Sequence, residues 1–162
     1  MPRVTQLGHV GIYVQDLPKM RDFYTRVMGL TVTDEDTERG LTFMSSRPDA
    51  EHHEFVLMPG RTAAPDAKLV QQISWHVDSV EDLLAFHQVL KDDESAQIQR
   101  EITHGNALAI YFHDPEGNTV EVYWSTDKKI PQPFGKPVDM EQSVEDVLAQ
   151  AAKLIEGIPE RV

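Results

Sequence analysis

Four polar residues with metal-binding side chains stand in segments that are otherwise rich in apolar and aromatic residues: His9, Glu54, Gln72 and Glu121. Imidazole, carboxylate and amide groups bind divalent metal ions through nitrogen or oxygen, and a carboxylate without a partner is costly to bury. One divalent ion would account for all four residues together. The alternative is that each side chain lies on the solvent-facing side of its strand, which is common in antiparallel sheets.

An internal repeat relates these positions in pairs. Residues 9–17 align with residues 72–80 at an offset of 63, and residues 48–57 align with residues 115–124 at an offset of 67. His9 then matches Gln72, and Glu54 matches Glu121. Because unrelated surface residues have no reason to recur in register, the repeat favours the metal hypothesis for His9 and Glu121.

The repeat also predicts the elements that must position these residues. Each copy opens with the alternation of a strand and continues with helical spacing, over Leu17 to Val27 in the first copy and Val80 to Leu90 in the second. Two more strands and a proline-containing turn into a last strand complete each copy. The intermediate strands are expected at about 31–36, 41–45, 96–102 and 107–113. We therefore predict an α+β fold of two βαβββ modules, about 5–59 and 69–125, that form a curved, cup-like mixed β-sheet.

The sheet domain is expected to cover residues 1–126, with the stretch 60–68 as the linker between its modules. Residues 127–162 are expected to form an extended arm and then a helix over 143–156. One face of that helix is apolar: Val144, Val147, Leu148, Ala151, Leu154 and Ile155. Such a face needs a surface to cover, so we expect a homo-oligomer that forms through this helix or through sheet edges.

Composition restricts the partners. Fifteen Lys and Arg residues against 27 Asp and Glu residues give a formal net charge of −12, which repels nucleic acids and anionic membrane surfaces. The absence of cysteine excludes thiolate ligands, so a metal must be held by His, Asp, Glu or Gln. The N-terminus has no apolar segment typical of a secretory signal, and we expect a cytoplasmic protein.

Two motifs resemble the opening and closing signatures of the vicinal oxygen chelate superfamily, the family of glyoxalases, bleomycin resistance proteins and extradiol dioxygenases. The first is Gly8-His9-Val10-Gly11-Ile12-Tyr13-Val14 with Asp16-Leu17 and Phe23-Tyr24, and the second is the stretch from Tyr111 to Tyr123. The resemblance covers roughly Leu7 to Trp124, in the same order as in the family. It implies a divalent metal centre that includes His9 and Glu121.

Within the superfamily, the chain is most similar to small type I extradiol dioxygenases, which hold Fe(II) on two His and one Glu. The resemblance implies that His53, in Glu51-His52-His53-Glu54, is the active-site base. It gives His104, in Thr103-His104-Gly105-Asn106, the place of a histidine that lies behind the metal ligands, and it gives Tyr111 the place of a tyrosine that contacts the substrate. It therefore implies a small aromatic substrate of the catechol type that reacts with O2.

One residue departs from this pattern. The repeat places the second His ligand of the family at position 72, where this chain has Gln72. The expected metal set is therefore His9, Gln72 and Glu121, with Glu54 as a further donor and His76, about 13 Å along the same strand face, as the alternative.

A set of His, Gln and Glu also resembles the isomerase and lyase branches, such as glyoxalase I. Fe(II) is the metal expected from the dioxygenase resemblance, with Mn, Ni, Zn or Co as alternatives. The competing functions are a metal-dependent isomerase or lyase and a non-catalytic protein that binds a small molecule.

Overall fold

The computed structural model describes residues 1–64 and 66–160. Position 65, in the expected linker, and positions 161–162, at the end of the expected C-terminal region, lie outside the described residues. The chain divides into two compact units, Met1–Ala67 and Lys68–Val162, each with its own sheet.

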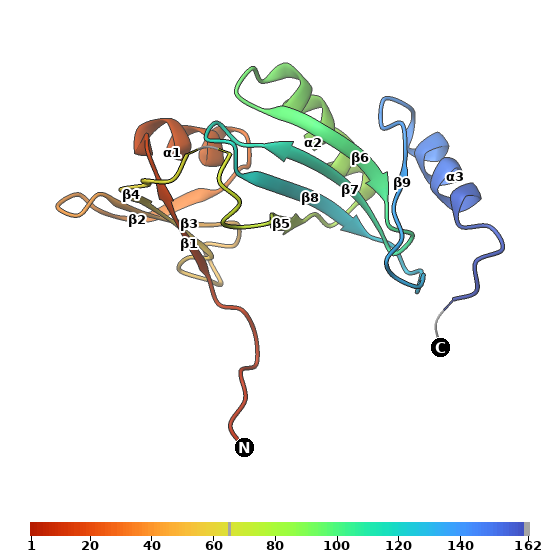
Figure 1. The fold of residues 1–162 in the computed structure, drawn as a ribbon, viewed down its shortest axis with the longest axis horizontal. Helices are drawn as coiled ribbons and strands as arrows, with labels where there is room; N and C mark the ends of the chain where they lie inside the picture. Colours follow the sequence, from red (N-terminus) through yellow and green to blue (C-terminus); the bar gives the residue numbers. More distant parts are fainter. Residues whose placement is uncertain (65, 161–162) are drawn as a thin grey trace. The chain divides into compact units, whose positions relative to one another are not determined.

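The first unit contains β1 (Val10–Val14), α1 (Leu17–Arg26), β2 (Thr31–Asp36), β3 (Leu41–Ser45) and β4 (Phe55–Pro59). Its sheet has the order β1-β4-β3-β2, in which only the pairing of β1 with β4 is parallel (Figure 1). The Asp16 side chain accepts a hydrogen bond from the Lys19 backbone amide and caps α1. Gly29 follows the helix with a φ of 71°, a conformation that glycine adopts without strain.

The second unit repeats this plan with β5 (Ile73–His76), α2 (Val80–Asp92), β6 (Gln97–Thr103), β7 (Ala107–His113) and β8 (Thr119–Ser125). Its sheet has the order β5-β8-β7-β6-β9, with β5 and β8 parallel and the short β9 (Lys136–Pro137) added beside β6. Ser79 caps α2. The predicted α+β class and the two βαβββ modules with mixed strand pairing are confirmed.

Each sheet packs apolar side chains against its own helix. α1 packs against β4, and α2 packs against β6, β7 and β8. The largest fully buried side chains of the two cores are Met20, Phe23, Tyr24, Met44, Phe55 and Leu57 in the first unit and Leu83, Leu90, Leu108, Ile110 and Phe112 in the second. One face of each sheet is therefore core, and the other is available for polar side chains.

A one-residue bulge occurs at the same place in both modules. The register shifts between Val32 and Asp34 in β2, and between Ile98 and Arg100 in β6. A bulge of this kind moves every following side chain to the opposite face of the sheet. As a result, Asp34 pairs with Phe43, and Arg100 pairs with Tyr111.

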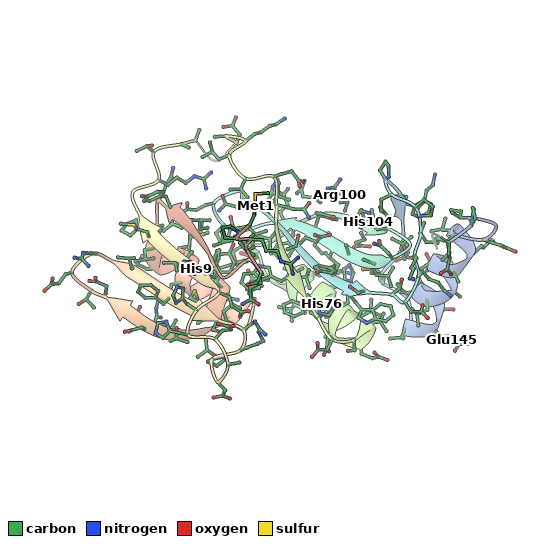
Figure 2. The ribbon with its side chains drawn as sticks, turned by 90° about the horizontal axis from the view of Figure 1, so that it is seen from below. Met1, His9, His76, Arg100, His104 and Glu145 are labelled. Atoms are coloured by element: carbon green, nitrogen blue, oxygen red, sulfur yellow. The ribbon has the colours of Figure 1, made fainter. Side chains whose placement is uncertain are left out.

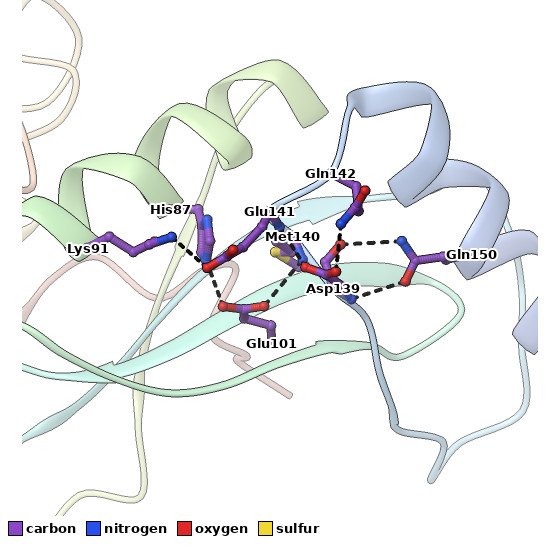
Figure 3. A network of polar contacts seen from close by, with 8 residues as sticks. All are labelled: His87, Lys91, Glu101, Asp139, Met140, Glu141, Gln142 and Gln150. Carbon is purple, nitrogen blue, oxygen red and sulfur yellow. Dashed lines mark hydrogen bonds and ion pairs between the residues drawn. The ribbon is translucent and has the colours of Figure 1, made fainter.

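The C-terminal arm docks on the outside of the second unit, where α3 (Val144–Leu154) contacts α2. Buried His87 of α2 contacts Glu101 of β6 at 2.6 Å, and the second Glu101 oxygen accepts a hydrogen bond from the Met140 amide (Figure 3). Lys91 forms an ion pair with Glu141 beside it. These contacts tie the arm to the core of the module.

The buried face of α3 is narrower than its sequence predicts. Val147 is fully buried and Ala151 is 8% exposed, whereas Leu148 and Leu154 are each 37% exposed. Of the apolar face predicted for this helix, Leu148 and Leu154 are therefore not packed within the chain, which leaves a partner's surface as the way to cover them. The described part of the chain contains no helix long and apolar enough to span a membrane.

Candidate functional site

The first unit brings together the predicted metal ligand His9 and the predicted base His53. His9 immediately precedes β1 and His53 lies just before β4, and these two strands are parallel neighbours. The two imidazole rings have centroids 4.5 Å apart. Phe43 of β3 lies edge-on to His53 at 5.1 Å and forms an apolar wall beside it.

His53 is held in a hydrogen-bonded chain that selects its tautomer. Its Nδ1 lies 2.9 Å from Nδ1 of His52, so one of these nitrogens must donate and the other must accept. His52 Nε2 lies 3.9 Å from Asp34 Oδ2, which favours a proton on that nitrogen. The neutral pair is then satisfied when His53 Nδ1 donates to His52, and this leaves His53 Nε2 with a free lone pair. Burial, followed by the charges of His9 and His52, lowers the pKa of His53 below 6.5, so the neutral form is favoured at pH 7.

Glu54 has a different environment from the one expected of a metal ligand. One of its oxygens accepts hydrogen bonds from the amide and the hydroxyl of Ser46, at 2.9 and 2.6 Å, and the other accepts two from Arg47. Burial alone would raise the pKa of Glu54, but the bonds from Ser46 and Arg47 outweigh it and lower this pKa below 4.5. These contacts indicate that Glu54 holds the turn after β3.

The second unit groups the other predicted residues on one face of its sheet. Glu121 pairs with Ser74 on one side and with Tyr111 on the other. Gln72 donates from Nε2 to Glu121 Oε2 at 2.6 Å, and the Ser74 hydroxyl donates to the same oxygen. Glu121 is 6% exposed, and among the described residues no Lys, Arg or His forms an ion pair with it. A buried carboxylate held only by neutral donors is a favourable position for a cation.

Tyr111 and His104 continue this face beyond Glu121. Burial, followed by a hydrogen bond to Glu121 and the charge of that residue, raises the pKa of Tyr111 to about 12, so its hydroxyl stays protonated at neutral pH. His104 Nε2 lies 3.0 Å from this hydroxyl, and Nδ1 lies 2.7 Å from the Phe134 carbonyl oxygen. Because a carbonyl only accepts, Nδ1 carries a proton, and Nε2 of the neutral ring can accept a hydrogen bond from the Tyr111 hydroxyl.

His76 lies apart from this group. It is exposed, its ring lies 5.2 Å from that of Tyr123, and it pairs with Tyr123 rather than with Glu121. This position, one full side-chain repeat beyond Ser74, supports Gln72 over His76 as a partner of Glu121.

Arg100 also belongs to this face and was not predicted from the sequence. Its guanidinium carbon lies 4.1 Å from the centre of the Tyr111 ring, a cation–π contact. Figure 2 shows Arg100 and His104 along and just beyond β6. The regular register of β6 would place Gln99 there, so only the bulge reveals Arg100.

The donors present fit a divalent metal ion in their chemistry. In the first unit, His9 supplies an imidazole nitrogen, and in the second unit, Gln72 and Glu121 supply an amide oxygen and a carboxylate. Each is a donor type that suits Fe(II), Mn, Ni, Zn or Co. Gln72 uses only its nitrogen in its hydrogen bonds to Ser74 and Glu121, so its oxygen is available. Within the described residues of either unit, no three His, Asp or Glu side chains are gathered to hold a metal.

A sequence profile described as "Glyoxalase/Bleomycin resistance protein/Dioxygenase superfamily" matches residues 6–122 of the chain. Biphenyl-2,3-diol 1,2-dioxygenase 2 of Rhodococcus globerulus is 30% identical over 126 residues, which cover 75% of this chain. The aligned region spans 64% of the length of that dioxygenase.

Two solved structures are similar in fold. One is FosX, the fosfomycin resistance protein of Listeria monocytogenes, solved as a mutant with Mn(II) and dihydroxypropylphosphonic acid. It matches with a TM-score of 0.62 at 17% identity, and the match covers 77% of this chain and 94% of the FosX chain. Lactoylglutathione lyase of Agrobacterium tumefaciens matches with a TM-score of 0.58 at 17% identity and covers 76% of this chain and 96% of its own. At this identity, these likenesses describe the fold alone.

Proposed function

Because the chain belongs to the glyoxalase/bleomycin resistance protein/dioxygenase superfamily, we propose that it is a metal-dependent extradiol-type dioxygenase that cleaves the ring of a catechol-like aromatic with O2. The observation that carries this proposal is the presence of two proton-transfer groups beside the predicted ligands. His53 lies against His9, and the Tyr111–His104 pair lies against Glu121. The likeness to a biphenyl-2,3-diol dioxygenase supports the same reaction.

His9, Gln72 and Glu121 are the proposed ligands, and Fe(II) is the proposed metal. When bound, Fe(II) supplies a redox-active centre with open positions at which a catechol and O2 can meet. In the overall reaction, the ring carbon–carbon bond beside the diol breaks, and both atoms of O2 enter the ring-opened product.

The protein's own groups handle protons. His53 Nε2, free in the tautomer that His52 stabilises, accepts a proton from one catechol hydroxyl. The Tyr111 hydroxyl stays protonated and can donate its one proton in a hydrogen bond to the substrate, with His104 Nε2 as the alternative acceptor of that bond. The Phe43 ring covers one flank of His53.

The second candidate is an isomerase or lyase that uses the metal as a Lewis acid and needs no oxygen. Gln72 favours it, because a neutral amide is a weaker ligand than the second imidazole that the extradiol resemblance leads us to expect. The FosX structure with Mn(II) and the lactoylglutathione lyase, which share the fold, are consistent with this alternative. A purely binding protein would have little reason to keep His9 and Glu121 together.

The test is metal analysis of anaerobically purified protein, followed by catechol titration and then by admission of O2. Iron, a spectral change with catechol, oxygen uptake and a yellow ring-opened product are expected. Nickel, zinc or cobalt with no oxygen uptake would favour the isomerase or lyase. Absence of any stoichiometric metal would favour the binding protein.

A further inference from the structure

Arg100 is a cation on the polar face of the second unit's sheet, and no carboxylate among the described residues forms an ion pair with it. Its guanidinium is exposed and stacked at 4.1 Å over the ring of Tyr111, which itself is 4% exposed. Stacking holds the planar group in place and leaves its N–H edge available to a ligand.

The β6 bulge is what gives Arg100 this position. In the sheet, Arg100 pairs with Tyr111, which pairs with Glu121, which pairs with Ser74. The next residue, Glu101, faces the opposite side and contacts His87 of α2. Without the bulge, Gln99 would pair with Tyr111, and Arg100 would face the opposite side of the sheet.

The first module provides an internal comparison. Its bulge puts Asp34 in the matched position, opposite Phe43, and Asp34 has His52 within 3.9 Å. The matched acid thus has a partner in its own unit, and Arg100 has no ion-pair partner among the residues described in its unit. The position carries a charge in both modules, and in the second module that charge is available to a ligand.

We propose that Arg100 recognises an anionic group on the substrate, and that the substrate is a catechol-like aromatic with a carboxylate. This inference rests on the proposed function. A guanidinium donates two parallel hydrogen bonds to a carboxylate, and its place beside Tyr111 sets the carboxylate next to the face that carries Glu121. The net charge of −12 repels anions in general, so a preference for an anion requires a local cation.

The experiment compares 3,4-dihydroxyphenylacetate with its neutral amide, which has nearly the same shape. Anaerobic calorimetry of the metal-loaded protein should show the acid binding at least about 10-fold more tightly. Arg100→Gln should bring this ratio close to one and leave the affinity for the amide unchanged. Arg100→Lys should retain part of the preference, because it keeps the charge and loses the planar fork.

Arg26→Gln is the matched control, since it removes the same charge from an exposed helix position where Arg26 pairs with Asp22. It should leave the acid-to-amide ratio unchanged. An equal affinity of the wild type for both ligands would overturn the role of Arg100, while the binding of both would still support a catechol site.

If neither ligand binds, the proposed function fails and a second readout decides on Arg100. Benzoate, but not benzamide, should shift the NMR signal of the Arg100 side-chain Nε–H, and this shift should be absent from Arg100→Gln. If benzoate does not change the chemical shift of the Arg100 Nε–H, the proposal for Arg100 is wrong, whatever the protein does with catechols.

Discussion

The side-chain amide of Gln72 donates a 2.6 Å hydrogen bond to Glu121 Oε2 across the parallel strands β5 and β8. Gln72 is the residue that departs from the extradiol pattern, and Glu121 is the carboxylate that fits it. The hydrogen bond joins the two. If both residues bind the proposed metal ion, the Gln72 oxygen would face that ion while its nitrogen orients Glu121.

The first prediction concerns metal affinity. Gln72→Ala should lower it by about 10- to 100-fold, because a ligand and a partner of Glu121 are both lost. His76→Ala is the control on the same strand and should have little effect, since His76 pairs with Tyr123. His9→Ala and Glu121→Ala should lose the metal while remaining folded. Competition with a chelator measures all four variants, and a greater loss in His76→Ala than in Gln72→Ala would reverse the assignment.

A second prediction concerns stability and pH at Glu54. Glu54→Gln should lower the free energy of unfolding at pH 7 by about 1 to 3 kcal/mol, because charge-assisted bonds to Ser46 and Arg47 are lost. The folded state lowers the pKa of Glu54 below 4.5, so its stabilisation is complete above that value and is lost as the pH falls through the folded pKa.

Urea denaturation at several pH values checks this prediction. The gap between wild type and Glu54→Gln should be widest near neutral pH and should close in acid. Glu38→Gln removes the same charge from an exposed position and should change stability by less than about 0.5 kcal/mol. A gap that widens as the pH falls would contradict a lowered pKa of Glu54 in the folded state.

A third prediction concerns the C-terminal arm. Met140 is 2% exposed, so Met140→Ala should cost about 2 to 5 kcal/mol of unfolding free energy. Leu148 is 37% exposed, and Leu148→Ala should cost less than about 1 kcal/mol in the monomer. Chemical denaturation distinguishes the two, and equal losses would mean that the arm does not dock on the second unit through Met140.

A fourth prediction assigns the exposed leucines of α3 to self-association. Leu148 and Leu154 leave apolar surface uncovered on a helix that buries only Val147 and Ala151. The double substitution of both by Glu should shift a homo-oligomer to smaller species without unfolding it. Light scattering measures the size, and an unchanged oligomer would move the interface to another surface, such as a sheet edge.

The sequence predicted the modules well because their strands and helices differ in periodicity. The predicted strand bounds 31–36, 41–45 and 107–113 coincide with those of β2, β3 and β7. Gln72 and Glu121, which the repeat singled out, are neighbours in the structure. The repeat could predict these positions because matched residues of the two modules occupy matched positions in their sheets.

Other features could not be predicted because they depend on single-residue irregularities or on tertiary packing. The bulges after Val32 and Ile98 lie in polar strands, where an extra residue leaves no break in the pattern, so Asp34 and Arg100 were missed. Helical spacing placed Leu148 with Val147 on one apolar stripe. Contact with α2 covers only part of that stripe, and this is a property of the packing.

The last prediction tests the role of His53. His53→Ala should reduce turnover by about 10² to 10⁴ and leave the metal content unchanged, because a general base acts on the substrate and not on the ion. Part of the lost turnover should be recovered at higher pH, since the catechol then ionises without help.

His52→Ala removes the acceptor of the 2.9 Å contact with His53 Nδ1. It should give a smaller loss of turnover, because the ring of His53 remains while its tautomer is no longer selected. His113→Ala, at the end of β7, is the control for loss of an imidazole elsewhere and should leave turnover unchanged. Oxygen uptake measured across pH decides the matter: a His53→Ala variant with wild-type turnover at neutral pH would remove His53 from the reaction.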